Sequence, residues 1–187
     1  MANPVQPPSC TTEELEDILM PDGFPDCDPD DYNEVYANII LGDGETAKSL
    51  KTLKDLGITH VLNAAWGTNE DLGFVDTQAS TYEPLGMKFL GIQAKDLSDF
   101  NLSSHFNRAA DFIESGLSSN GKVYVHCYMG ISRSASIVIA YLMIKKGMSV
   151  KEAVTTVRSQ RSIIPNKGFL TQLCQLNDDL RRTRGGQ

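Results

Sequence analysis

Cys127 and Arg133 lie six positions apart in the sequence, with Gly130 between them. The apolar run before Cys127 has the pattern of a buried strand, and a long apolar segment restarts after Arg133 with the pattern of a helix. Backbone N–H groups in a loop between a strand and a helix have no strand partners, so they can converge on an anion at the positive end of the helix dipole. An arginine adds a planar, two-pronged donor that matches phosphate oxygens. Residues 128–133 are therefore predicted to form an anion site.

A cysteine at the base of such a site changes its chemistry. A free thiol has a pKa of about 8.5, which falls to roughly 3.5–7.5 at a helix N-terminus beside a cation. Cys127 would then be a thiolate where a phosphorus atom would lie, with the phosphate oxygens held by amides and Arg133. The alternative is a buried structural cysteine that behaves as a small hydrophobe. The spacing to Arg133, the glycine and the strand–loop–helix context favour a nucleophile that attacks a phosphoryl group.

The elements that must position this loop alternate along the chain from residue 34. The apolar patterns predict strands at 35–36, 39–41, 59–65, 88–94 and 122–126, and helices at 45–56, 103–117, 132–146, 149–160 and 167–183. Residues 66–86 are predicted to form a long polar loop, in which Trp66 and Tyr82 could flank the site. Strands separated by helices predict an α/β fold: a five-stranded, mostly parallel, twisted sheet with helices on both faces.

The composition sets limits on the class of protein. A chain of 187 residues can bury a core without disulfides. The cysteines contain no CxxC pair and the histidines have no zinc-like spacing, which predicts reduced thiols, no bound metal, and a cytoplasmic or nuclear location: Cys10, Cys27, Cys127 and Cys174, and His60, His105 and His126. Neither a signal peptide nor a membrane-spanning helix is expected.

Charge is divided along the chain, whose net charge is -7. Residues 1–121 carry 6 Lys and Arg against 21 Asp and Glu, whereas residues 122–187 carry 11 against 3. A basic half that holds the loop would attract anionic substrates, unless the two halves simply pair with each other. We predict an acidic N-terminal arm over residues 1–31 with a short helix from Thr11 or Thr12 to Met20, and a flexible tail over 182–187. The arm could be a docking or autoinhibitory element, or merely solvated.

Residues 126–134, HCYMGISRS, match the signature HCxxGxSRS of cysteine-dependent dual-specificity protein phosphatases. Further stretches resemble the small atypical members related to the vaccinia virus phosphatase: GITHVLNAA (57–65), AKDLSDFNLSSHF (94–106), SRSASIVIAYLM (132–143) and PNKGFLTQLCQLND (165–178). The resemblance covers residues 32–181. It implies a protein tyrosine phosphatase-like fold and hydrolysis of phosphotyrosine, phosphoserine and phosphothreonine through a phosphocysteine, without a cofactor.

The resemblance also implies roles for single residues. Asp96 lies at the position of the general acid and base, with Asp99 as the alternative, because a phosphoryl transfer needs a proton for the leaving oxygen. Ser134 matches the hydroxyl that bonds the cysteine sulfur, and His126 matches the histidine that orders the loop. Arg161 matches a position that receives a second phosphate or an acidic substrate residue; Arg158 or a solvated basic face is the alternative. The phosphate is expected to bind to Arg133 and the loop residues Tyr128, Met129, Gly130, Ile131 and Ser132.

Other readings of the loop lead to other classes of protein. A phospho-binding pseudophosphatase is the main alternative, although Cys127, Arg133 and Asp96 are all present. Phosphoinositide-directed relatives tend to carry lysines inside the loop, RNA-directed relatives usually have Asn and Thr near the arginine, and rhodaneses and arsenate reductases lack the Asp96 segment. The expected partners are phosphoproteins, with MAP kinases a family expectation only, and the expected state is a monomer or weak dimer without nucleic acid or membrane. The uncharged rim formed by Tyr128 and Met129 could favour aromatic substrates or disfavour acidic peptides.

Overall fold

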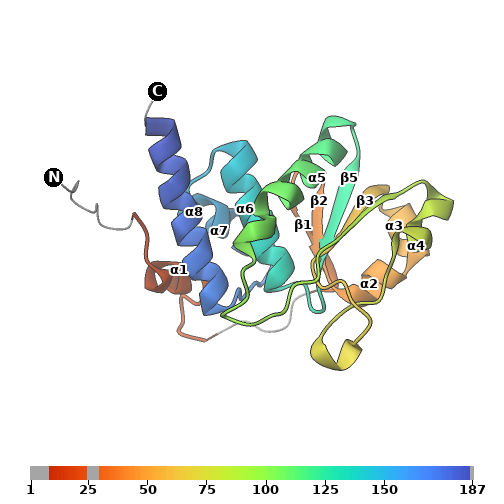
Figure 1. Cartoon of the computed structure of the whole chain (residues 1–187), viewed down its shortest axis with the longest axis horizontal. Coiled ribbons are helices and arrows are strands. Elements are labelled where there is room, and N and C mark those ends of the chain that lie inside the picture. Colours follow the sequence, from red (N-terminus) through yellow and green to blue (C-terminus); the bar gives the residue numbers. More distant parts are fainter. Residues whose placement is uncertain (1–8, 25–29, 186–187) are drawn as a thin grey trace.

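The computed structural model describes residues 9–24 and 30–185. Within them, five strands form one sheet (Figure 1): β1 Tyr32–Tyr36, β2 Ile39–Gly42, β3 Ile58–Asn63, β4 Lys88–Gly91 and β5 Lys122–His126. The order across the sheet is β1-β2-β5-β3-β4. Strand β1 is antiparallel to β2, and the other neighbouring pairs are parallel. The predicted five-stranded, mostly parallel sheet is confirmed.

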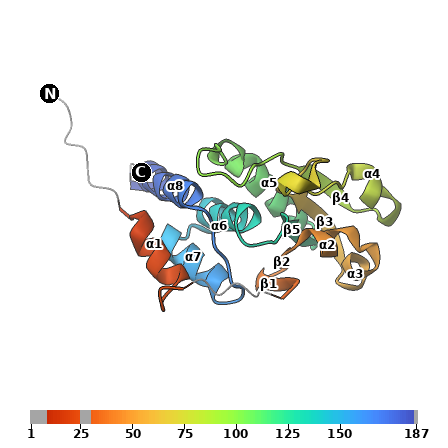
Figure 2. The same ribbon diagram turned by 90° about the horizontal axis from the view of Figure 1, so that it is seen from below.

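Helices cover both faces of the sheet (Figures 1 and 2). One face contacts α5 (Phe106–Ser118), α6 (Arg133–Lys146) and α7 (Val150–Arg158), with α8 (Lys167–Gly185) packed on α6. The other face contacts α2 (Gly44–Lys48), α3 (Leu50–Asp55) and α4 (Ala79–Tyr82). Because successive strand residues point to opposite faces, Ile39 and Leu41 join the core beneath α6, whereas Ile40 joins the core beneath α3. A sheet buried on both faces explains why its strands read as continuous apolar runs.

The predicted helix over residues 45–56 is broken in two. Ser49 lies between α2 and α3 with φ −86° and ψ 88°, outside the helical region. Its hydroxyl accepts a hydrogen bond from the N–H of Thr52 at 3.4 Å, so it caps the start of α3. A serine inside an apolar helical repeat can thus end one helix and begin the next, which the repeat alone does not reveal.

The strands predicted over 59–65 and 88–94 end earlier, at Asn63 and Gly91. Asn63 is fully buried; its side-chain amide donates to the carbonyl of Val75 at 2.9 Å, and its side-chain oxygen accepts from the N–H of Ala65 at 2.9 Å. These bonds turn the chain out of β3 into residues 66–86. This segment, predicted as a polar loop, contains α4 and two short 3₁₀ helices, η1 (Glu70–Leu72) and η2 (Glu83–Leu85).

Tyr82 does not flank the site as expected. It is fully buried and donates to the carbonyl of Ala47 at 2.9 Å, because a tyrosine in a core needs a partner for its hydroxyl. Trp66 is half exposed.

Residues 9–20 of the acidic arm pack on the basic C-terminal half. Helix α1 (Thr12–Leu19), which confirms the predicted short helix, buries Leu15 and Leu19 against α7 and α8 (Figure 2). Salt bridges join Glu14 to Lys151 at 2.8 Å and Glu13 to Lys167 at 3.4 Å. The arm is therefore part of the packed structure rather than merely solvated. Asp26 and Asp28 of the predicted arm lie outside the described residues.

The last helix is longer than predicted. Helix α8 continues to Gly185, through residues that the sequence assigned to a flexible tail. Arg184 near its end donates to the carbonyl of Met143 at 2.7 Å, which ties this last turn to α6. None of the helices in residues 9–24 and 30–185 has both the length and the apolar character needed to cross a membrane.

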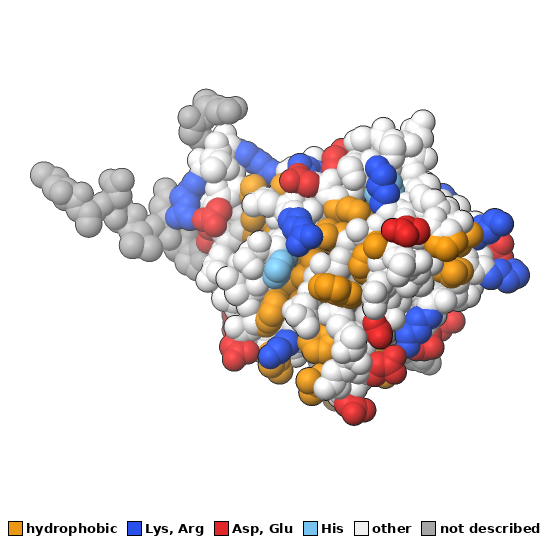
Figure 3. Space-filling view, turned by 45° about the vertical axis from the view of Figure 1, so that its right-hand side comes forward, with side chains coloured by type: hydrophobic (Ala, Val, Ile, Leu, Met, Phe, Trp, Pro, Cys, Tyr) orange, Lys and Arg blue, Asp and Glu red, His pale blue; other side chains and the backbone are white. Residues whose placement is uncertain are grey.

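Acidic and basic side chains do not occupy separate areas on every face of the molecule. On the face shown in Figure 3, acidic and basic side chains are interspersed, and hydrophobic side chains gather between them. The salt bridges of α1 show that part of the acidic N-terminal half pairs with the basic C-terminal half.

The parallel strands bring their carboxyl ends to one edge of the sheet. Strand β2 leads there into Asp43, β4 into the segment that contains Asp96, and β5 into Cys127. Ligand sites of open α/β sheets form at this edge. The fold therefore gathers residues that are far apart in the sequence around the loop 127–132.

Candidate active site

The carbonyl groups of the loop between β5 and α6 accept hydrogen bonds from residues outside the loop. The carbonyl of Tyr128 accepts from the N–H of Gly44 at 3.0 Å, and that of Ile131 accepts from the N–H of Ile164 at 2.8 Å. Arg161 donates to the two carbonyls between them, those of Met129 at 3.1 Å and Gly130 at 2.9 Å.

Four consecutive carbonyls that face outward turn the following N–H groups inward. In a trans peptide the C=O and the next N–H point in opposite directions. The N–H groups of Met129, Gly130, Ile131 and Ser132 are therefore directed to the inside of the loop, where they can bind an anion. One of them, the Gly130 N–H, donates to Cys127 Sγ at 3.3 Å.

Only glycine fits at position 130. Its φ is +70°, a region that side chains rarely adopt, and a Cβ atom there would come within 2.2 Å of the carbonyl oxygen of Gly42. The loop thus packs directly on the end of β2. This contact fixes the loop relative to the sheet.

Cys127 lies at the base of the loop and is 1% exposed. Its sulfur accepts hydrogen bonds from the Gly130 N–H and from Ser134 Oγ, the latter at 3.1 Å. Burial alone would raise the pKa of the Cys127 thiol, but the charge of Arg133 and the hydrogen bonds outweigh burial, so its pKa is lowered. The sulfur therefore has the environment of a thiolate nucleophile rather than of a structural cysteine.

The lowered pKa of Cys127 predicts how its alkylation by iodoacetamide depends on pH. The thiolate is the reactive form and predominates above the pKa, so alkylation should persist at pH values below the titration of an ordinary thiol. Ser134→Ala removes a hydrogen bond to the thiolate and is expected to move the midpoint up by about one pH unit. Mass spectrometry of the peptide that contains Cys127 separates this reaction from that of the other thiols. An unchanged midpoint in Ser134→Ala would contradict the assignment.

Arg133 begins α6 and is 3% exposed. Two carbonyls position its guanidinium: Nη1 donates to Ala94 at 3.1 Å, and Nη2 donates to Gly73 at 2.9 Å. Its Nε is buried and has no hydrogen-bond partner among the described residues. A buried N–H without a partner is costly, so this donor marks where an anion would be stabilised.

Asp96 lies against the same loop. Its Oδ1 accepts from Ser132 Oγ and from Asn166 Nδ2, both at 2.8 Å, and its Oδ2 lies 3.7 Å from Arg133 Nε. The alternative acid, Asp99, makes no side-chain hydrogen bond or ion pair with any residue in the described part of the chain. The geometry thus brings Asp96, and not Asp99, into contact with the loop.

Asn166 has a second role that the sequence did not reveal. It caps the last helix: its side-chain oxygen accepts from the N–H of Phe169 at 3.0 Å. Its amide group also holds Asp96, across 70 residues of sequence.

His126 is fully buried at the start of the loop. Burial lowers the pKa of its imidazole to about 4, against the opposing effect of the Cys127 carbonyl, so the ring is neutral at pH 7. Because a carbonyl only accepts, Nδ1 carries the proton and donates to the carbonyl of Cys127 at 3.1 Å. His126 therefore fixes the peptide that follows the nucleophile, as the resemblance implied.

Arg161 is buried, and its donors are used by the protein. Besides the two loop carbonyls, Nη1 donates to the carbonyl of Asp30 at 2.5 Å and to Asn33 Oδ1 at 2.7 Å. In this arrangement its visible role is to orient the loop, and contact with a second phosphate stays a prediction. Arg158 donates to the carbonyl of Leu19 at 3.0 Å, so it ties down the end of α1.

The remaining loop side chains form the rim and the wall. Tyr128 is 52% exposed and Met129 is 51% exposed, Ile131 is partly buried, and Ser132 is buried. The N–H groups directed to the inside of the loop are those of Met129, Gly130, Ile131 and Ser132. The expected uncharged rim is present at Tyr128 and Met129.

A family model of the dual specificity phosphatase catalytic domain matches residues 39–179. The chain belongs to this family. Dual specificity protein phosphatase 26 from Homo sapiens is 44% identical over 183 residues, which is 95% of this chain and 81% of that protein.

Solved structures show the same family fold. Human DUSP28 aligns with a TM-score of 0.70 and 25% identity over 82% of this chain and 97% of that one. The human tyrosine phosphatase-like serine/threonine/tyrosine-interacting protein aligns with a TM-score of 0.68 and 31% identity, over 79% and 96%. This dual specificity phosphatase fold is thus the protein tyrosine phosphatase-like fold that the sequence implied.

Proposed function

We propose that this protein hydrolyses phosphotyrosine, phosphoserine and phosphothreonine in phosphoproteins through a phosphocysteine at Cys127. The observation that carries the proposal is the convergence on one sulfur of inward N–H groups, Ser134 Oγ and the charge of Arg133. The family membership of the chain agrees with this chemistry. Phosphoryl transfer needs such positioning and charge stabilisation more than any further covalent chemistry.

The reaction is proposed to run in two steps. The phosphate group binds to the loop N–H groups and to Arg133, whose buried Nε has no hydrogen-bond partner among the described residues. The thiolate of Cys127 attacks phosphorus, the P–O bond to the substrate breaks, and Asp96 in its protonated form gives its proton to the leaving oxygen. Asp96 then takes a proton from water as the water attacks the phosphocysteine. Ser134 stabilises the departing thiolate through its hydrogen bond to Sγ.

Asp96→Asn tests the assignment of the acid. We expect it to lower kcat by roughly 100-fold on a phosphothreonine peptide, because an alkoxide leaving group needs a proton. The loss should be smaller on p-nitrophenyl phosphate, whose leaving group is stable as an anion. Asp99→Asn is the matched control, and its rate should stay near that of the wild type. A larger loss in Asp99→Asn than in Asp96→Asn would overturn the assignment.

The second candidate function is a phospho-binding module. The interacting protein named among the solved structures shares the fold. Phosphopeptide binding without release of phosphate by the wild type would favour this function over hydrolysis. From the family resemblance we propose MAP kinases as substrates and a monomer or weak dimer as the state of the protein. The reduced-thiol pattern supports a cytoplasmic or nuclear location.

A further inference from the structure

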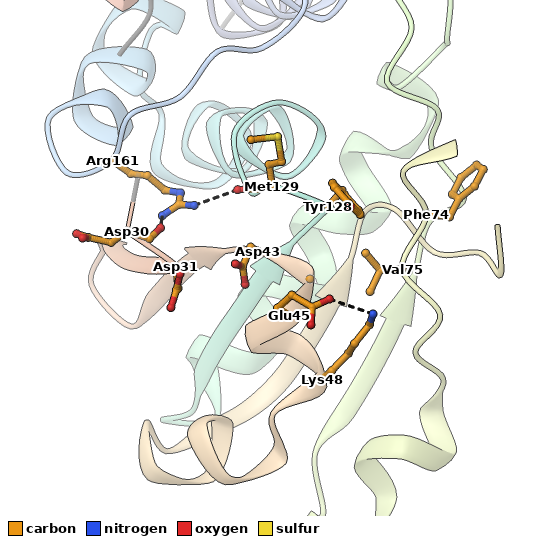
Figure 4. A pocket seen from close by; sticks show the side chains of 11 residues that line it. Asp30, Asp31, Asp43, Glu45, Lys48, Phe74, Val75, Tyr128, Met129 and Arg161 are labelled. Atoms are coloured by element: carbon orange, nitrogen blue, oxygen red, sulfur yellow. Dashed lines mark hydrogen bonds and ion pairs between the residues drawn. The ribbon is translucent and has the colours of Figure 1, made fainter. Parts of the chain in front are cut away.

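A cavity of about 290 Å³ lies beside the catalytic loop (Figure 4). Two of its wall residues, Tyr128 and Met129, directly follow Cys127 in the sequence. The hydrogen bond from the Gly44 N–H to the Tyr128 carbonyl joins the loop to the opposite wall. Residues on one side of a phosphorylated residue held in the loop can therefore reach this cavity.

The charge of the cavity is predominantly negative. Asp30, Asp31, Asp43 and Glu45 line it, together with two cations, Lys48 and Arg161. Lys48 is already paired with Glu45 at 3.1 Å and with Glu70 at 2.9 Å. The N–H groups of Arg161 are largely occupied by carbonyls and by Asn33, although its charge offsets part of the field.

Three of the acids have no ion-pair partner. No Lys or Arg in residues 9–24 and 30–185 makes a salt bridge with Asp30, Asp31 or Asp43. Asp31 is exposed, and Asp43 is partly buried, with Oδ1 accepting from the N–H of Thr46 at the start of α2. A cation brought by a substrate would find unpaired carboxylates here.

The rest of the wall is apolar. Phe74 and Val75 face the cavity from the segment after η1, opposite the acids, and Tyr128 adds an aromatic ring at the rim (Figure 4). A lysine or arginine side chain combines an aliphatic stem with a charged end, so it matches a cavity with one apolar and one acidic wall. The tyrosine ring can also attract a cation.

We infer that this cavity is a specificity site for a lysine or arginine close in sequence to the phosphorylated residue of the substrate. The inference rests on the proposed function, because the catalytic loop is what brings the peptide to the cavity. It names the substrate class: phosphoproteins with a basic residue within two positions of the phosphorylated one. The same carboxylates disfavour acidic neighbours, so this inference opposes the expected contact of Arg161 with a second phosphate or an acidic substrate residue.

The test compares phosphotyrosine peptides that differ only in having Lys, Leu or Glu at one or two positions on either side of phosphotyrosine. At the favoured position, kcat/KM for the Lys peptide should exceed that for the Glu peptide by about tenfold at low ionic strength, and the ratio should shrink as salt screens it. Equal values for the Lys, Leu and Glu peptides at every position would overturn the inference.

Asp31→Lys and Glu45→Lys test whether the preference for the Lys peptide depends on the acids of the cavity. Each is expected to reduce the Lys-to-Glu ratio several-fold, because a repulsive charge replaces an attractive one. Glu83→Lys, a matched charge change outside the cavity, should keep the wild-type ratio. A ratio that changes equally in all three variants would reflect net charge and would contradict a local site.

Two further measurements separate this inference from the proposed function. Each protein is assayed on p-nitrophenyl phosphate, which lacks neighbouring residues. Turnover of that ester without a preference among the peptides contradicts the specificity site but not the hydrolytic function. Absence of turnover contradicts the hydrolytic function. In the second case, the affinities of the wild type for the same peptides show whether the cavity is a site for a basic residue. Tighter binding of the Lys peptide supports the site, and equal affinities contradict it.

Discussion

Cys127→Ser is expected to abolish turnover while the protein stays folded and still binds phosphopeptides. A serine hydroxyl is a far weaker nucleophile than a thiolate at neutral pH, so kcat should fall by roughly 10⁴-fold or more. The size of the side chain is nearly unchanged, and the donors around it, the Gly130 N–H and Ser134 Oγ, remain in place. The rates of phosphate release from an aryl phosphate and a phosphotyrosine peptide measure the effect.

Binding distinguishes a lost nucleophile from a lost site. The loop N–H groups and Arg133 are untouched in Cys127→Ser, and the negative charge of the thiolate is gone, so phosphopeptide affinity should be kept or improved. Cys174→Ser, which changes another buried thiol, is the matched control and should retain turnover. Full activity in Cys127→Ser would show that the sulfur takes no part in the reaction.

Arg133→Lys is expected to lower kcat/KM by roughly 10³-fold even though it keeps the positive charge. The guanidinium of Arg133 is fixed by the carbonyls of Ala94 and Gly73, and its buried Nε has no hydrogen-bond partner among the described residues and lies 3.7 Å from Asp96 Oδ2. An ammonium group cannot make both anchoring bonds and also present a planar pair of donors to phosphate oxygens.

The loss in Arg133→Lys should affect both binding and chemistry, because charge on the transferred phosphoryl oxygens is stabilised in the transition state. Steady-state kinetics on an aryl phosphate give kcat and KM separately. Arg108→Lys on the exposed side of α5 is the control for an arginine outside the site, and it should behave as the wild type. Near-normal kcat/KM in Arg133→Lys would show that charge alone suffices and would contradict the geometric argument.

The loop was predictable from the sequence because its parts are local. Cys127, Gly130 and Arg133 lie within one strand–loop–helix unit, and short-range geometry decides what their backbone can bind. Asp96, Ser134 and His126 required the family resemblance, because nothing in the sequence near each of them tells which group it contacts. The parallel sheet followed from the alternation of apolar segments.

What the sequence did not reveal depends on contacts between distant segments. Arg161 orients carbonyls about thirty residues away, and Asn166 holds Asp96 across 70 residues. The acids of the cavity come from the segment before β1, from Asp43 directly after β2 and from Glu45 in α2, whereas its apolar wall comes from residues 74–75. The break at Ser49 depends on one side-chain cap within an otherwise regular helical repeat.

The central claim is that a phosphoryl group passes through the sulfur of Cys127. It is tested most directly by mixing the protein with a phosphotyrosine peptide, quenching with acid during turnover, and locating added phosphate by mass spectrometry. The mechanism predicts one phosphoryl group on the peptide that contains Cys127. With p-nitrophenyl phosphate as the donor, whose leaving group needs no proton, this group should accumulate further in Asp96→Asn, because only hydrolysis of the intermediate is then slowed. Turnover with no covalent phosphate on Cys127, or with phosphate on another residue, would contradict it.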